Sequence, residues 1–160
     1  MNSPGSLALR SLTTLLNETL FCAGEHSGYL LNPKDPGLVD TLRGISAKVA
    51  STPPKPGRTP IVSHSNHMLY GIELANRALS GETGVYESAD WDVAWRLETI
   101  DDQPWEELID RTERESQLLI DLVNQRRDWD ETTFTGVSAI APHTAYHLGA
   151  IRQMLLDIGK

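Results

Sequence analysis

The sequence has a single cysteine, Cys22, so it has no internal disulfide framework and suits a reducing compartment such as the cytoplasm. No apolar run approaches the ~20 residues of a membrane span. The N-terminus also lacks the features of a secretory signal. Basic residues number 14 against 22 acidic ones, giving a net charge of −8 with no basic run. Since nucleic-acid binding needs a positive surface, we expect a cytoplasmic protein that binds neither membranes nor nucleic acid.

Length and hydrophobic pattern favour one all-α domain. The chain has 160 residues, enough for a single domain spanning residues 1–160 and few for two. Apolar residues recur at three- and four-residue steps, whereas no stretch shows the strict alternation of a strand. We therefore predict four long helices and a shorter helix between the first two. The long helices are expected at 6–22, 60–79, 101–126 and 138–157, and the short one at 36–50.

Proline and glycine mark the connections between these helices. Asp35-Pro36 is typical of a helix start, and the proline-rich segment 51–57 cannot be helical. The connection 81–101 is long enough to travel the length of a bundle. We therefore expect the second and third long helices to run parallel, joined by a crossover. Pro142 is tolerated only in a first helical turn, which fits a last helix that begins near residue 138.

Two pairs of histidines lie on the predicted helices. His143 and His147 are four residues apart, so their imidazoles share one face and can bind one metal ion. His64 and His67 form the second pair, at a similar depth in another helix. Side chains on facing helices can meet in the core of a bundle. The spacing therefore predicts a metal site made of His143, His147 and one or both of His64 and His67.

The chemistry of this ligand set favours a catalytic site. Imidazole nitrogen suits zinc, nickel, copper or iron, and three histidines leave one coordination position open. The segment between His143 and His147 lacks the glutamate of HExxH metalloproteases, and neither pair has the Glu-x-x-His pattern of di-iron bundles. The alternative is that the histidines are core residues held by hydrogen bonds to their neighbours.

The histidine segments resemble the DinB-like superfamily, which comprises damage-inducible proteins and thiol S-transferases that use bacillithiol or mycothiol. The likeness is carried by residues 63–70 (SHSNHMLY) and 146–153 (YHLGAIRQ), with weaker support from residues 35–42 and 81–95. The resemblance implies a four-helix bundle of DinB-like type with a long crossover between helices 2 and 3. It also implies a homodimer, since homodimers are common in the superfamily.

The same resemblance implies a divalent-metal triad of His67, His143 and His147, with zinc, nickel, iron or manganese as the ion. The family's helix-2 ligand sits just before an apolar run, and His67 before Met68-Leu69 fits that position better than His64. His64 is left with three roles: a hydrogen-bond partner of a ligand, an alternate ligand, or a surface residue.

Three residues that flank the histidines are candidates for orienting a substrate: Tyr70, Tyr146 and Arg152. Roles in helix packing are an equal alternative for each of them. Cys22, at the end of the first predicted helix, is expected to be a buried small residue rather than a nucleophile. The sequence names no catalytic acid, base or nucleophile.

Two functional hypotheses follow from these observations. The first is a metal-dependent enzyme that acts on a small molecule, through S-transfer from a low-molecular-weight thiol or through hydrolysis. The open coordination position of a three-histidine site motivates it. The second is a non-catalytic, acidic helical module that dimerises or binds a partner protein, with the metal absent or structural.

Overall fold

The computed structural model describes residues 4–26 and 28–159, and this part of the chain is all-α, as the sequence predicts. It contains seven helices and no strand beyond an isolated bridge between Cys22 and Pro36. None of the described helices combines the length and apolar character that crossing a membrane requires. The helices are α1 (Pro4–Leu20), α2 (Leu38–Arg43), α3 (Ala47–Ala50), α4 (Ile61–Leu79), α5 (Trp91–Ala94), α6 (Asp102–Gln125) and α7 (Glu131–Ile158).

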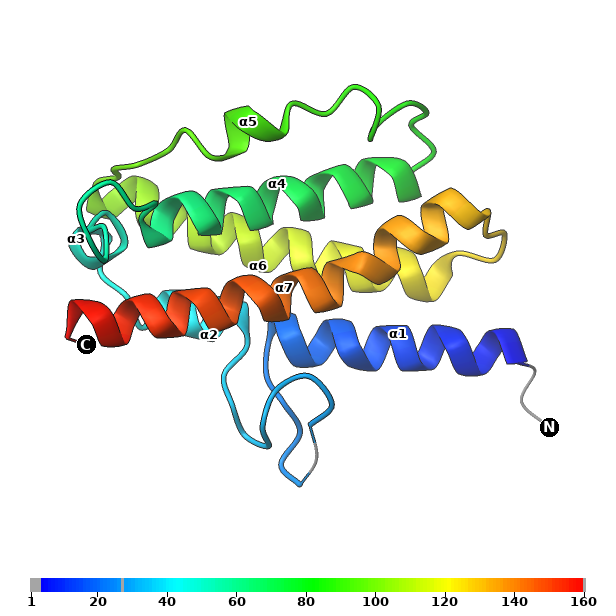
Figure 1. The fold of residues 1–160 in the computed structure, drawn as a ribbon. Helices are drawn as coiled ribbons and strands as arrows, with labels where there is room; N and C mark the ends of the chain where they lie inside the picture. The colour runs from blue at the N-terminus through cyan, green and yellow to red at the C-terminus, as the bar shows by residue number, and fades with distance from the viewer. Residues whose placement is uncertain (1–3, 27, 160) are drawn as a thin grey trace.

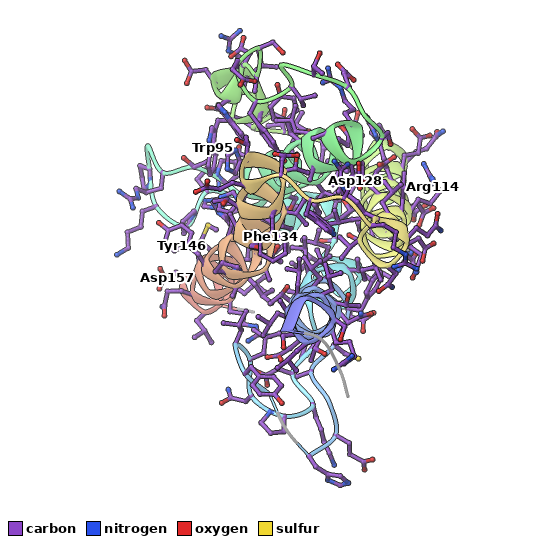
Figure 2. The ribbon with its side chains drawn as sticks, turned by 90° about the vertical axis from the view of Figure 1, so that its right-hand side faces the viewer. Trp95, Arg114, Asp128, Phe134, Tyr146 and Asp157 are labelled. Atoms are coloured by element: carbon purple, nitrogen blue, oxygen red, sulfur yellow. The ribbon has the colours of Figure 1, made fainter. Side chains whose placement is uncertain are left out.

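The four long helices α1, α4, α6 and α7 lie side by side (Figure 1) and are seen nearly end-on in Figure 2. Each packs against two others, so that α1 contacts α6 and α7, and α4 contacts the same two. Figure 1 shows α4 and α6 running in one direction and α1 and α7 in the opposite one. The predicted parallel course of the second and third long helices is therefore confirmed.

One hydrophobic core lies between these helices. Leucine and isoleucine side chains at helical spacing meet there, and each contributes roughly 1.5–3 kcal/mol when it is fully buried. The fully buried members from the four long helices include Leu16, Leu20, Ile72, Leu119 and Ile151. This core holds α4 and α7 face to face, which brings the two histidine segments together.

The crossover between α4 and α6 carries the short helix α5 and runs along α4. Three polar side chains of α4 hold it there, at the three- and four-residue steps of one helix face. Ser63 and Asn66 donate hydrogen bonds of 2.6 and 2.8 Å to crossover carbonyls, and the Tyr70 hydroxyl accepts one of 3.0 Å from a crossover N–H. These bonds position Trp95, which directly follows α5.

The predicted short helix at 36–50 is wrong in both its start and its continuity. It is two helices, α2 and α3, and the N-cap of α2 is Gly37 rather than Asp35. Asp35 instead accepts a hydrogen bond from Arg152 at 3.0 Å, a partner 117 residues away. Ser46 separates the two helices because its hydroxyl accepts a hydrogen bond from a backbone N–H of α3 and caps that helix.

A buried carboxylate organises the loop that follows α1. Glu18 is 4% exposed, and its Oε1 accepts hydrogen bonds from the N–H groups of Tyr29, Leu30 and Leu31 at 2.9, 2.7 and 2.6 Å. Charge-assisted bonds of this kind offset the cost of burying the carboxylate. Cys22, at the base of the loop, is exposed, so the predicted burial of its side chain is wrong.

We expect Glu18→Ala to loosen this loop, because three N–H groups then lose their acceptor. The free energy of unfolding should fall by about 2 kcal/mol, and the amides of residues 29–31 should exchange with solvent at least about tenfold faster. Urea unfolding and amide hydrogen exchange measure the two effects. Glu25→Ala, in an exposed glutamate of the same loop, is the matched control. Equal exchange rates in the two variants would contradict the role of Glu18.

Candidate metal centre

The last helix, α7, is longer than the sequence predicts. The side chain of Asp130 caps it by accepting a hydrogen bond from the N–H of Thr133 at 2.8 Å, so α7 begins directly after this aspartate. The predicted start near residue 138 is therefore wrong, and Pro142 lies in the helix interior. Because proline has no N–H, the helix loses one hydrogen bond there. Figure 1 shows that α7 is not straight, and a proline in the helix interior is a physical cause of such a bend.

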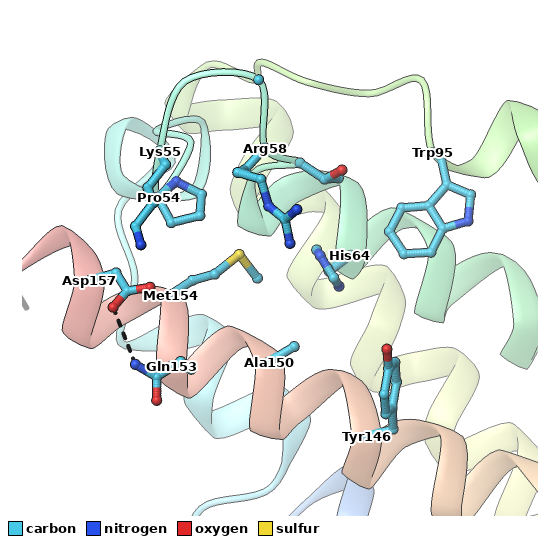
Figure 3. Close-up of a pocket in the computed structure, with 12 residues that line it drawn as sticks. Pro54, Lys55, Arg58, His64, Trp95, Tyr146, Ala150, Gln153, Met154 and Asp157 are labelled. Atoms are coloured by element: carbon cyan, nitrogen blue, oxygen red, sulfur yellow. Dashed lines mark hydrogen bonds between the residues drawn. The ribbon is translucent and has the colours of Figure 1, made fainter.

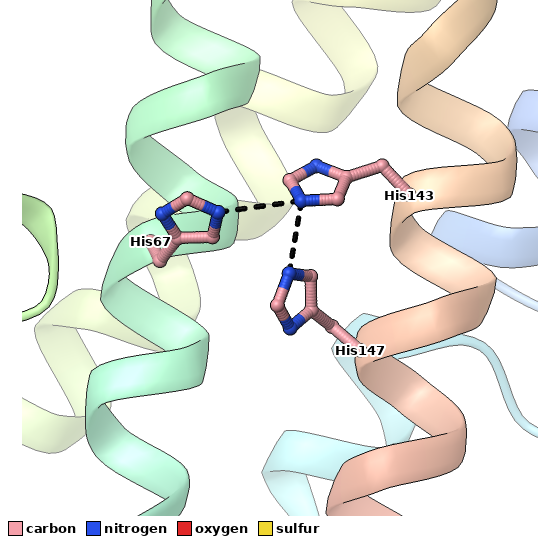
Figure 4. Close-up of side chains that lie close together, drawn as sticks. All are labelled: His67, His143 and His147. Atoms are coloured by element: carbon pink, nitrogen blue, oxygen red, sulfur yellow. Dashed lines mark hydrogen bonds between the residues drawn. The ribbon is translucent and has the colours of Figure 1, made fainter. Parts of the chain in front are cut away.

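Three histidines from two facing helices meet in the core (Figure 4). His67 lies on α4, and His143 and His147 lie one turn apart on α7. Nε2 of His143 is 2.9 Å from Nε2 of His147 and 3.3 Å from Nε2 of His67. His67 and His147 are only 7% and 3% exposed, and His143 is half-buried. The ligand atoms of all three lie within 4.8 Å of one another, close enough to bind one metal ion.

One metal ion can engage all three nitrogens, whereas hydrogen bonds among them cannot. A neutral imidazole nitrogen either donates one proton or accepts one through a single in-plane lone pair. Nε2 of His143 faces two such nitrogens at once, so hydrogen bonds alone pair the three poorly. A tetrahedral zinc ion with Zn–N bonds of about 2.0–2.1 Å holds its nitrogens about 3.3 Å apart. The observed 2.9 and 3.3 Å are close to that spacing.

Burial keeps these imidazoles in the neutral form that binds metal. Desolvation lowers the pKa of His147 to about 3 and the pKa of His67 to about 4, and repulsion from neighbouring histidines adds to both shifts. Desolvation also lowers the pKa of His143. A histidine must be neutral to bind a metal ion. The three side chains therefore need no deprotonation near neutral pH.

His64 and Trp95 cover the cluster on the crossover side. Nδ1 of His64 lies 2.9 Å from Nδ1 of His147, so His147 faces a different histidine with each ring nitrogen. Trp95 stacks on His67, with ring centroids 4.2 Å apart, and contacts His64 and His147 at 5.0 and 5.6 Å. Nδ1 of His67 is buried and has no hydrogen-bond partner among the described residues. Of the three roles left open for His64, this geometry favours that of hydrogen-bond partner to a ligand.

The residues predicted to orient a substrate lie in three different settings. Tyr70 is engaged by the crossover backbone through its hydroxyl. Tyr146 is 71% exposed, and its ring lies edge-on to His147 with centroids 5.1 Å apart. The guanidinium of Arg152 is occupied by Asp35 at 3.0 Å. Only Tyr146 therefore remains available to a ligand beside the histidines.

A pocket of about 790 Å³ lies beside the cluster, between α7 and the segment that precedes α4 (Figure 3). His64, Trp95 and Tyr146 line it, and each of them contacts His147. Lys55 and Arg58 extend into it from the segment before α4. Sequence reasoning missed both cations, because it treated this proline-rich segment only as a linker. The Pro-Gly pair between them was the available signal, since it marks a turn.

The stacking of Trp95 on His67 predicts a fluorescence signal for metal binding. Cobalt(II) absorbs light and is paramagnetic, so binding at the cluster should quench the emission of the indoles in contact with it. We expect Trp95→Phe to reduce the cobalt-dependent quenching, with a remainder from Trp91, whose ring centroid lies 5.6 Å from that of His67. Trp129→Phe should retain the quenching, because Trp129 packs against Phe134 instead of the histidines. Quenching of equal size in both variants would place the bound cobalt elsewhere.

Comparisons of the chain with protein-family models, with curated proteins and with solved structures find no match. Membership of a family is therefore not shown, and the likeness of residues 63–70 and 146–153 to the DinB-like superfamily stays a prediction. The geometry of the histidine cluster and of the pocket beside it is what supports a function for this chain.

Proposed function

We propose that the chain is a metal-dependent enzyme of the DinB-like superfamily, a four-helix bundle whose core holds one divalent transition-metal ion. The observation that carries the proposal is the meeting of three Nε2 atoms, from His67, His143 and His147, on two facing helices. The long crossover between the parallel helices α4 and α6 agrees with the architecture that the resemblance implies. Zinc and nickel suit the all-nitrogen donor set, and iron or manganese are alternatives.

The surrounding side chains set the protonation and orientation of His147 and shield His67 from water. With Nε2 of His147 as ligand, its Nδ1 carries the proton and donates it to Nδ1 of His64. That contact orients the His147 ring and requires His64 to carry its own proton on Nε2. Trp95 packs over His67 and excludes water from that face. When bound, a divalent ion supplies Lewis acidity that lowers the pKa of a thiol or water at the site.

The reaction we propose is attack by a low-molecular-weight thiol on a small electrophile. The thiol releases its proton to water, its sulfur forms a bond to carbon, and the leaving group departs with the electron pair of the bond that breaks. Hydrolysis, with water in place of the thiol, is the second version of the same chemistry. Both need one position that the three histidines do not fill, and a three-ligand site provides it. His64, Trp95 and Tyr146 contact the cluster and line the pocket through which such a molecule would arrive.

Turnover of a generic electrophile tests the proposal. Zinc- or nickel-loaded protein should accelerate the reaction of 1-chloro-2,4-dinitrobenzene with a thiol, or the hydrolysis of 4-nitrophenyl acetate. Chelation or His147→Ala should reduce the rate to background. His26→Ala, in an exposed loop, should have no effect. Identical rates in all variants would overturn the enzymatic proposal.

Metal analysis and oligomeric state address the second hypothesis. A content below about 0.2 metal ion per chain after repletion, with no change in melting temperature on chelation, would contradict the metal site. The chain would then be better described as a non-catalytic acidic module. Light scattering coupled to gel filtration tests the homodimer that the resemblance implies.

A further inference from the structure

Two cations on one tight turn face the pocket beside the histidine cluster. Residues 55–58 (KPGR) form this turn, closed by a 3.1 Å hydrogen bond from the N–H of Arg58 to the carbonyl of Lys55. Proline in the second position and Gly57, with φ of 74°, in the third match a type II turn. Glycine adopts that φ without strain. Because the first and last residues of such a turn lie close together, Lys55 and Arg58 reach the pocket side by side.

Neither cation is neutralised within the protein. In the residues that the structure describes, Lys55 and Arg58 form no ion pair and no side-chain hydrogen bond, although the chain has 22 acidic residues. The acidic side chain that lines the same pocket is Asp157. It accepts a hydrogen bond of 3.2 Å from Gln153, its neighbour on α7 (Figure 3). Two unpaired cations facing one pocket are available to an anion from solution.

One wall of the pocket is apolar, beside polar side chains such as Gln153 and Thr59. Trp95, Met154 and Ala150 line it, and His64 lies at the side that contacts the histidine ligands. A volume of about 790 Å³ accommodates a small molecule. An occupant that pairs with the two cations and packs against the apolar wall has an anionic group at one end and an apolar body.

We propose that this pocket binds an amphipathic small molecule through a carboxylate or phosphate group held by Lys55 and Arg58. The apolar body lies against Trp95 and Met154 and directs the other end of the molecule towards His64. Lys55 and Arg58 thus select anionic substrates. That this molecule is a substrate rests on the proposed function; its binding to the pocket does not.

Isothermal titration calorimetry with small aromatic probes tests this proposal. The full chain, stripped of metal with a chelator, is titrated at about pH 8, where the histidines are neutral. Phenylphosphonate and benzoate carry a phosphate-like group and a carboxylate, and benzyl alcohol is the uncharged analogue. We expect both anions to bind at least about tenfold more tightly than benzyl alcohol. The tighter of the two identifies the preferred anionic group.

Three substitutions in the pocket and one control outside it locate the binding site. Lys55→Gln and Arg58→Gln should each weaken anion binding about tenfold, whereas Lys48→Gln, in a lysine of α3 outside the pocket, should not. Asp157→Asn should strengthen binding, because it removes a like charge from the pocket. Equal affinity for the anions and benzyl alcohol, or unchanged affinity in both cation variants, overturns the proposal.

The two proposals fail in different ways. Metal binding and turnover without anion-selective binding leave the proposed function intact and overturn the substrate class. Anion-selective binding that depends on Lys55 and Arg58, in a protein without turnover, supports the pocket and overturns the enzyme.

Discussion

Replacing His147 by alanine is expected to abolish tight metal binding, with a loss of affinity of at least about 100-fold. His147 is the most enclosed of the three proposed ligands, at 3% exposure, and its two ring nitrogens face His143 and His64. The substitution removes one of three donors and also the partner of His64. His143→Ala and His67→Ala should have effects of similar size. Competition of the protein with a chelating indicator for zinc measures the affinities.

The relative loss of metal affinity in the histidine variants tests which histidines are the ligands. His64→Ala should weaken binding by only about 10–100-fold, because His64 contacts His147 and not the point where the Nε2 atoms meet. His26→Ala should leave binding unchanged, since this histidine lies in an exposed loop. A larger loss in His64→Ala than in His67→Ala would show that His64 is the helix-2 ligand.

Acid should destabilise the metal-free protein well before its carboxylates titrate. Folding lowers the pKa of His67 to about 4 and the pKa of His147 to about 3, mainly through desolvation, whereas unfolded histidine titrates near 6.5. Between these values the unfolded state binds more protons, so stability falls as pH falls from about 6.5 towards 4. Each of the two histidines contributes roughly 1 kcal/mol per pH unit in this window. Urea unfolding at several pH values measures the slope.

A double variant isolates the contribution of His67 and His147 to this slope. His67→Gln with His147→Gln removes both groups and should reduce the dependence between about pH 6.5 and 5, with a remainder from His64 and His143, whose pKa values desolvation also lowers. His26→Gln is the matched control and should keep it. The raised pKa of Glu73, caused by burial, acts in the opposite direction but is present in every variant. An unchanged slope in the double variant would show that these histidines are not buried in neutral form.

The sequence alone predicted the features that depend on local spacing. The helices α4 and α6 lie within two residues of their expected ends, because the residues that start and stop a helix are neighbours of its ends in the sequence. The crossover followed from the length of its segment. The shared face of His143 and His147 followed from helical geometry. A local signal also misled the prediction: Pro142 indicated a start near residue 138, whereas α7 begins after its cap at Asp130.

Only the tertiary structure decided which side chains meet. Packing of α4 against α7 brings His67 to the two histidines of α7 and leaves His64 against the far nitrogen of His147. It also pairs Arg152 with Asp35, across 117 positions of the chain. The turn at residues 55–58 is local, but the pocket it faces is made by α7. Helix formation depends on neighbours in sequence, whereas a site between helices depends on the relative rotation and depth of both, which the whole core determines.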